Sequence, residues 1–523
     1  MRHILATCLL LISLSLAAQV AHEGRFELEY ETEIKDFVII PNHEYGALIV
    51  TPRFRNSSQD YPVQLDFVDA DLKGVWREEI SVEKRFNLMG YYAWGQISYL
   101  LFQNRTNDTY TKIVKVDPLN NEVVQMEPKQ IVDLDITEFE VIQNTAILGG
   151  YYEERPAVFA YDMESNKVRT LSNVYQRNSE LVEIKVNADS LTFNVIASIE
   201  TENKDRTLMV NTYDYGGNLV RDYVLDIPQN YQLISGVSSS IWDKEQIVAG
   251  MYTVNSGTYP TGFFINHVDR TGIQNMKFYS FGQFDNFLNH AGKRKDKYKQ
   301  KSLNALKSEK AWRYKTAGVF KELIELDGKI LFTGEFYRPW SSSNLNYYRA
   351  QDQMNRYNQF NYAGGLGNPA IRPNSQSMTR AGVQNEINFT HSFAFELDYQ
   401  GNIQWDGSMN IEETIEDGLA SLGDFVHHDG NAYYAYYHDE LLVAAHLNAE
   451  NDSSQHVGAI TLLNEEDELR YERDDFRGLI RWHENKFLIH GIHHIRDEDL
   501  RKVFFVNAIS MNEVTSQITD SKQ

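Results

Sequence analysis

The chain has 523 residues and a formal net charge of −23, from 50 lysines and arginines against 73 aspartates and glutamates. This excess of negative charge disfavours nucleic acid and anionic membrane surfaces as partners, because both repel it. The single cysteine, Cys8, lies in the N-terminal segment described next, so the remainder of the chain has no disulfides, thiolate zinc sites or cysteine nucleophiles.

The first element is a short apolar segment at the N-terminus. Two basic residues precede an apolar run over 4–16, and the small residues Ala17 and Ala18 follow it. This order predicts a secretory signal peptide over 1–18, cut after Ala17 or Ala18, because the run is too short for a stable membrane anchor. We expect export without a transmembrane segment, to the periplasm, the outer membrane or the outside of the cell. Export without disulfides fits a Gram-negative bacterium.

The most informative feature is a polar turn that recurs between hydrophobic strands. An aspartate at the start of a turn bonds the backbone ahead of it, and glycine or asparagine at the end tolerates a positive φ. The copies follow one another at roughly 45–65 residues, with one longer interval, and a period of about this size is typical of a β-propeller. The copies start at Asp71, Asp117, Asp162, Asp214, Asp269 and Asp398, with weaker ones at Asn464 and Ser510.

The third unit shows the repeat most clearly. It has an apolar run with a Gly-Gly pair over 146–152, a second strand ending in Tyr161-Asp162, and an outgoing strand over 167–171. This pattern resembles a kelch-type repeat. The resemblance concerns the architecture and names no specific family.

We therefore predict an all-β protein, a single β-propeller of eight four-stranded blades over 19–523. Seven blades are the alternative, because the apolar run Leu441–Ala445 falls where a loop between the second and third strands of blade seven is expected. Residues Phe26–Tyr30 are available to pair beside the last blade and close the ring. The predicted blades lie near 36–80, 85–127, 133–172, 179–226, 231–280, 317–411, 419–473 and 476–519.

Two insertions break the period. The first, 282–315 between blades five and six, has apolar residues at helical spacing over 284–291, a basic run over 293–301 and a second predicted helix over 302–312. The second, 338–388 within blade six, is rich in Asn, Gln, Tyr and Ser and predicts a long loop. We expect neither insertion to contribute to the core.

Strand direction places both insertions on one face of the ring. If the strands of a blade are named a to d, the a–b and c–d turns open on one face and the b–c and d–a connections on the other. The first insertion is a d–a connection and the second a b–c connection, so we expect them side by side. The same argument assigns Asp474-Asp475 to this face and Glu465–Glu468 to the opposite one.

Motifs for catalysis are missing from the sequence. It contains no nucleophile elbow, phosphate-binding loop, dinucleotide fingerprint or His-Glu-x-x-His motif, so we predict no catalytic residue and no cofactor.

His438, His493 and His494 end strand b of blades seven and eight, where a metal site or a pH-responsive contact would be conceivable. Because adjacent strand residues point to opposite faces, no metal site is predicted.

The predicted binding residues are those that strand direction gathers on the insertion-bearing face. They are basic residues of the first insertion, aromatic residues of the second, and two histidines. The full set is Lys293, Lys295, Lys297, Lys299, Tyr337, Trp340, Tyr347, Tyr348, His438 and His493.

Two classes of function follow from this pattern. The first is a non-enzymatic binding or scaffold protein of the bacterial cell envelope, which holds an envelope protein on the insertion-bearing face. The alternative is a glycan-binding or glycan-active propeller, because aromatic and amide groups together stack on and hydrogen-bond sugars. A pair of carboxylates facing the central channel would favour a glycan-active protein.

Overall fold

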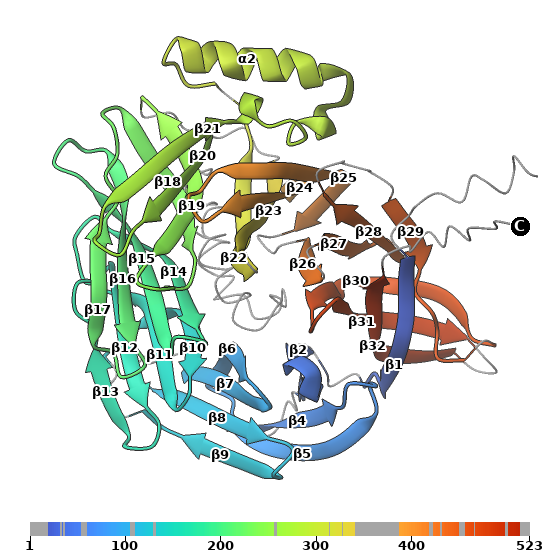
Figure 1. Ribbon diagram of the computed structural model, residues 1–523. Coiled ribbons are helices and arrows are strands. Elements are labelled where there is room, and N and C mark those ends of the chain that lie inside the picture. Colours follow the sequence, from blue (N-terminus) through green and yellow to red (C-terminus); the bar gives the residue numbers. More distant parts are fainter. Residues whose placement is uncertain are drawn as a thin grey trace, which may run out of the picture.

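Eight antiparallel four-stranded sheets stand around a ring in the computed structural model (Figure 1). The prediction of eight blades is confirmed, and the alternative of seven is wrong. The structure describes residues 19–31, 34, 37–53, 60–104, 110–128, 132–255, 259–312, 314–326, 328–339, 386–417, 422–428, 431–448, 455–464, 466–496 and 500–512.

Each blade is built from consecutive strands, except that the last blade takes its outermost strand from the N-terminus. Blades one to four comprise β2 (Val38–Pro41), β3 (Ala47–Pro52), β4 (Asp60–Val68), β5 (Gly74–Glu83); β6 (Phe86–Trp94), β7 (Ile97–Asn104), β8 (Thr111–Asp117), β9 (Glu122–Met126); β10 (Asp135–Ile142), β11 (Thr145–Tyr152), β12 (Arg155–Asp162), β13 (Lys167–Thr170); β14 (Glu180–Asn187), β15 (Thr192–Glu200), β16 (Arg206–Asp214) and β17 (Leu219–Val224).

Blades five to eight continue in the same order. They comprise β18 (Tyr231–Ser238), β19 (Gln246–Val254), β20 (Gly262–Val268), β21 (Gln274–Ser280); β22 (Ala317–Leu326), β23 (Lys329–Pro339), β24 (Glu386–Asp398), β25 (Ile403–Asp417); β26 (Gly423–His428), β27 (Asn431–His438), β28 (Leu441–Leu447), β29 (Gln455–Ala459); β30 (Glu468–Arg481), β31 (Lys486–Arg496), β32 (Leu500–Asn512) and β1 (Gln19–Glu29). The helical segments among the described residues are η1 (His43–Tyr45), η2 (Phe281–Gln283), η3 (Asn289–Arg294) and α2 (Lys295–Lys307).

The middle strands are apolar on both faces because each sheet packs between two neighbours. In blade three, Leu148 of β11 belongs to a core cluster shared with blade two, and the preceding residue, Ile147, belongs to one shared with blade four. Both side chains are fully buried. Alternate side chains of one strand therefore pack into two different interfaces between blades, and for this reason the middle strands are continuous hydrophobic runs in the sequence.

The predicted aspartate turns are hairpins, and they join the third and fourth strands of their blades, c and d in the naming used above. The Asp269 carboxylate accepts hydrogen bonds from the backbone N–H groups of Thr271 at 2.8 Å and Ile273 at 2.9 Å. In the first blade the equivalent residue is Asp69, two positions before the predicted Asp71, because its carboxylate accepts the corresponding backbone bonds.

Neighbouring blades are also tied together through these hairpins. A cation on the outermost strand of one blade donates to the hairpin of the next blade at three successive interfaces, and each bond fixes the rotation between two sheets. The pairs are Arg169–Asn218, Arg221–Asp269 and Lys277–Gln400.

The N-terminal strand closes the ring. β1 pairs antiparallel with β32, with Phe26 opposite Val506, as predicted for the segment 26–30. Blade eight consequently has no c–d hairpin of its own. The weak turn predicted at Ser510 is therefore wrong, because Ser510 lies inside β32 and pairs with Ala21.

Blades seven and eight differ from the prediction in their boundaries. The run Leu441–Ala445 belongs to strand c, because a tight b–c turn at Asp439 and Glu440, with φ of 50° and 63°, pairs β27 directly with β28. The Asn464 turn is then a d–a connection on the insertion-bearing face, and the assignment of 465–468 to the opposite face is wrong. Asp474-Asp475 falls within β30, so its assignment to a connection is also wrong.

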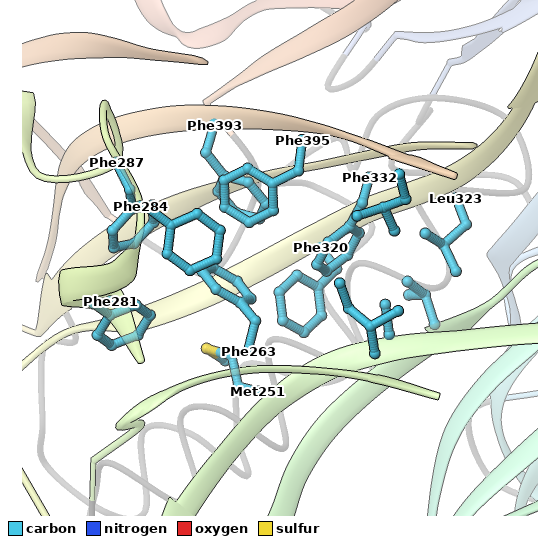
Figure 2. Packing of buried hydrophobic residues seen from close by; sticks show 14 of the residues in the cluster. Met251, Phe263, Phe281, Phe284, Phe287, Phe320, Leu323, Phe332, Phe393 and Phe395 are labelled. Carbon is cyan, nitrogen blue, oxygen red and sulfur yellow. The ribbon is translucent and has the colours of Figure 1, made fainter. Parts of the chain in front are cut away.

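The first insertion contributes to the core, contrary to the prediction. Phe281, Phe284 and Phe287 are buried against phenylalanines of blades five and six, including Phe263 and Phe395 (Figure 2). The Asp406 carboxylate of β25 holds the segment 284–288 as a loop through hydrogen bonds from its backbone. The helix α2 starts only at Lys295, within the basic run. The two helices predicted at 284–291 and 302–312 are therefore misplaced.

Replacing Phe287 with alanine should destabilise the ring by about 3–5 kcal/mol, because the fully buried ring would leave a cavity among aromatic neighbours. Chemical denaturation followed by tryptophan fluorescence measures the free energy of unfolding. Lys297→Ala, on the exposed side of α2, serves as the control and should stay near zero. A loss below about 1 kcal/mol for Phe287→Ala would show that the first insertion is dispensable for the core.

Candidate functional site

The two insertions meet at their roots, as strand direction predicts. His290 of η3 stacks on His391 of β24, with ring centroids 3.8 Å apart, and β24 is the strand that follows the second insertion. From this junction the first insertion passes along the outer edge of blade six. There the Asp406 carboxylate of β25 accepts backbone hydrogen bonds from Asp285, at 2.9 Å, and Phe287, at 2.8 Å. α2 accordingly lies at the circumference of the ring, beyond β21 and β25 (Figure 1).

The predicted basic residues sit on η3 and α2. Lys293 and Lys297 are exposed, whereas Lys295 and Lys299 are half-buried. Lys299 is also engaged, since its ammonium lies 3.0 Å from the Asp285 carboxylate. Of the four predicted lysines, two are therefore exposed cations at the outside of the ring, and Lys299 helps to hold the insertion.

The predicted aromatic residues divide into two groups. Tyr337 is 1% exposed and packs in the core cluster between blades six and seven, so it is a core residue and its prediction as a surface contact is wrong. Trp340, Tyr347 and Tyr348 lie outside the described residues.

The two predicted histidines also have different environments. His438 ends β27 on the insertion-bearing face, where its Nδ1 lies 2.8 Å from the Arg477 guanidinium. His493 is fully buried, and its Nδ1 lies 3.3 Å from the guanidinium of Arg25 on β1. Burial, assisted by Arg25, lowers the pKa of His493 to about 3. His493 therefore belongs to the ring closure, and its prediction as a surface contact is wrong.

A groove opens on the insertion-bearing face between blades three and four. It has a volume of about 760 Å³. It lies between the b–c turns of the two blades and the starts of strands β10 and β14. The residues that line it, called the acidic groove below, are Asp133, Asp135, Tyr151, Glu153, Glu154, Asn178, Ser179, Glu180, Glu200 and Arg206.

The acidic groove has a strong negative charge. Six carboxylates and one guanidinium line it, and Arg206 pairs with Glu180 at 2.9 Å. Glu153 and Glu154 form the b–c turn of blade three with φ of 47° and 62°, and the Tyr151 hydroxyl accepts the backbone N–H of Leu181 at 3.0 Å. The groove is therefore anchored to both blades and attracts cationic groups.

A second group of carboxylates lies on the innermost strands. Burial raises the pKa of Glu183 on β14 to about 7, although Lys185 and hydrogen bonds from Ser238 oppose the shift. Burial and the neighbouring Glu183 also raise the pKa of Glu140 on β10. The Lys185 ammonium donates to the backbone carbonyls of Ser238 and Leu323, each at 2.9 Å, and so links blade four to blades five and six. This part of the interior combines two acids that hold their protons more strongly than free glutamates do.

No three His, Cys, Asp or Glu side chains in the described ranges are grouped so that they could hold a metal ion. Nor does the described part of the chain contain a helix of the length and hydrophobicity needed to span a bilayer.

No family model and no curated protein matches the chain. Among solved structures it is similar to the β-propeller domain of the Trilobed protease from Pyrococcus furiosus, with 11% identity, a TM-score of 0.34, and coverage of 80% of this chain and 98% of that one. A prolyl endopeptidase is similar at 9% identity and a TM-score of 0.38, over 88% of this chain and 53% of that one. The apocarotenoid oxygenase of Synechocystis, in its cobalt-substituted form, is similar at 8% identity and a TM-score of 0.30, over 47% and 64%. Similarity at this level transfers no activity, and the fold rests on the strand pairing itself.

The raised pKa of Glu183 makes stability depend on pH. The folded chain keeps this proton up to a pH of about 7, whereas the unfolded chain releases it near 4.5. Stability is therefore lost as pH rises between these values, by about 3 kcal/mol at most. Glu183→Gln should remove this loss in denaturation curves recorded from pH 5 to pH 8. Glu79→Gln, on the exposed strand β5, should keep the wild-type profile, and identical profiles for all three proteins would contradict the assignment.

Proposed function

We propose that this protein is a non-enzymatic binding propeller of the bacterial cell envelope, which holds a protein partner on its insertion-bearing face. The acidic groove is the observation that carries the proposal. It combines a concave surface, a large excess of negative charge and attachment to two rigid blades. Residues in loops and turns on a rigid scaffold commonly form the binding sites of propellers and other β folds.

The chemistry of the groove indicates a basic segment of the partner. A volume of about 760 Å³ suits several extended residues, and six carboxylates favour Lys or Arg side chains. Electrostatic attraction of this kind raises the association rate and weakens with salt. The exposed Lys293 and Lys297, and the aromatic-rich segment 338–388, are proposed as further contact points for the same partner.

Export and the repeat type belong to the same proposal. A signal peptide over 1–18 would be removed without disturbing blade eight, because the pairing of β1 begins at Gln19, opposite Asn512.

The Gly-Gly pair of the third blade, Gly149-Gly150, lies in the middle strand β11, where a side chain at either residue would clash with neighbouring atoms. This tight packing supports a kelch-like description of the repeat.

The second candidate is a glycan-active propeller, which Glu140 and Glu183 favour. They lie on adjacent innermost strands and both hold protons more strongly than free glutamates do. A carboxylic acid kept protonated near neutral pH is what a general acid in glycoside hydrolysis requires. Release of reducing sugar from an envelope glycan, abolished by Glu183→Gln, would establish this candidate in place of the first.

The double variant Glu153→Lys/Glu154→Lys should weaken binding to the groove at least tenfold, because it reverses the charge of one wall. The probe is a fluorescent ten-residue Arg/Lys peptide, followed by anisotropy at 50 and 200 mM salt. Asp71→Lys/Glu164→Lys changes the net charge equally on exposed c–d hairpins of the opposite face and should retain affinity.

An equal loss in both double variants would mean that only the overall charge attracts the peptide. In that case the groove would not be the binding site, and the proposal would fail.

Export predicts a defined mature N-terminus. Mass spectrometry of the protein recovered from the envelope fraction of a Gram-negative host should show a chain that begins at Ala18 or Gln19. A chain that retains Met1 in that fraction would contradict the signal peptide.

A further inference from the structure

Two histidine rings join the first insertion to the blade that carries the second. His290 of η3 and His391 of β24 are stacked, with centroids 3.8 Å apart and planes inclined by 6°. His391 is fully buried. Two imidazoles at contact distance in a buried site are stable when both are neutral, because two imidazolium cations so placed would repel each other strongly.

The hydrogen bonds of His290 define its neutral form. Its Nδ1 lies 3.1 Å from the backbone carbonyl of Phe287, an acceptor, so Nδ1 carries the proton and donates it. Its Nε2 therefore accepts a hydrogen bond from the Tyr314 hydroxyl. A proton on Nε2 would force that hydroxyl to turn round and accept instead.

The hydrogen bonds of His391 leave one nitrogen unused. Its Nδ1 lies 2.9 Å from the Thr390 hydroxyl, whereas its buried Nε2 has no hydrogen-bond partner within the described part of the chain. A proton added to Nε2 would create a buried donor without an acceptor, which costs free energy. The rings of Phe287 and Phe336 enclose the same histidine, with centroids 4.8 and 5.1 Å away.

The charged groups around the stack also oppose protonation. Arg338 of β23 lowers the pKa of both histidines, after burial as the main cause, and Tyr314 hydrogen-bonds to Arg338. The nearby carboxylates are occupied elsewhere: Asp285 pairs with Lys299, and Asp406 accepts backbone N–H groups of the first insertion. No carboxylate in this set faces the rings to stabilise an added proton.

We propose that the His290–His391 stack is an acid-released latch that fastens the first insertion to the strands bordering the second. Repulsion between the rings, repulsion from Arg338 and the unsatisfied donor on His391 all act in the same direction when protons bind. The latch is closed at neutral pH, and acidification frees the segment from η3 to α2.

The direction of the pH dependence follows from the pKa values. Burial lowers the pKa of His290 to about 4 and that of His391 well below its usual value of 6.5. The contact is therefore at full strength above pH 6.5 and weakens as pH falls from there toward 4. The half-exposed η3 and α2 can open locally while the blades stay folded.

Hydrogen exchange tests this proposal. Amide protection in Asn289–Lys307 should fall at least tenfold between pH 7 and pH 4.5, after correction for intrinsic exchange, while protection in β19 stays constant. His290→Phe/His391→Phe keeps an aromatic stack that takes up no proton, and its protection should not change with pH. His446→Phe, on β28, should respond to acid as the wild type does.

Titration of the two histidine rings by NMR in the wild type gives a readout that does not depend on whether the His290→Phe/His391→Phe variant folds. In the wild type, both rings should keep the chemical shifts of neutral imidazoles at pH 6.5 and change only as the pH approaches 4 and below, because the closed latch lowers the pKa of each ring. The proposal is overturned if the wild type keeps its protection at pH 4.5, if the double variant loses protection equally, or if either ring takes up its proton near pH 6.5, as a free histidine does.

Discussion

Burial of both faces of every blade is the constraint on which the structure depends. A sheet with two apolar faces is stable only between two neighbours, so no blade can stand at an open end and the ring has to close. Neighbouring blades also diverge toward the circumference, which leaves space that side chains must fill. Between blades five and six the phenylalanines of the first insertion fill it, so an element that interrupts the repeat became part of the core.

The repeat could be predicted from the sequence because its signals are local. The bonds that Asp269 makes to Thr271 and Ile273 span at most five residues, and that chemistry is visible in the order of residues. The boundaries of blades seven and eight were less predictable. The b–c turn of blade seven has no glycine, since Asp439 and Glu440 adopt the positive φ themselves, and a turn without the usual residues leaves its flanking strand unrecognised.

The candidate site was harder to predict because it depends on contacts between distant segments. Strand direction correctly placed the root of the second insertion beside the first insertion, but one strand does not show which of its residues face a partner blade. Tyr337 and His493 were therefore expected at the surface and are buried. The acidic groove combines short segments of two blades, such as 133–135 and 178–180, each of which supplies only one or two of its six carboxylates. Only the ring places them around one hollow.

The pairing of β1 with β32 has a consequence for the order of folding. The first strand to be made pairs with the last one, across more than 480 residues of chain, since Gln19 lies opposite Asn512. Contacts of such long range form late, because the intervening chain must be ordered first. During synthesis, β1 must stay unpaired until β32 has been made. A chaperone that shields an extended N-terminal segment would therefore act at the step that limits assembly of the ring.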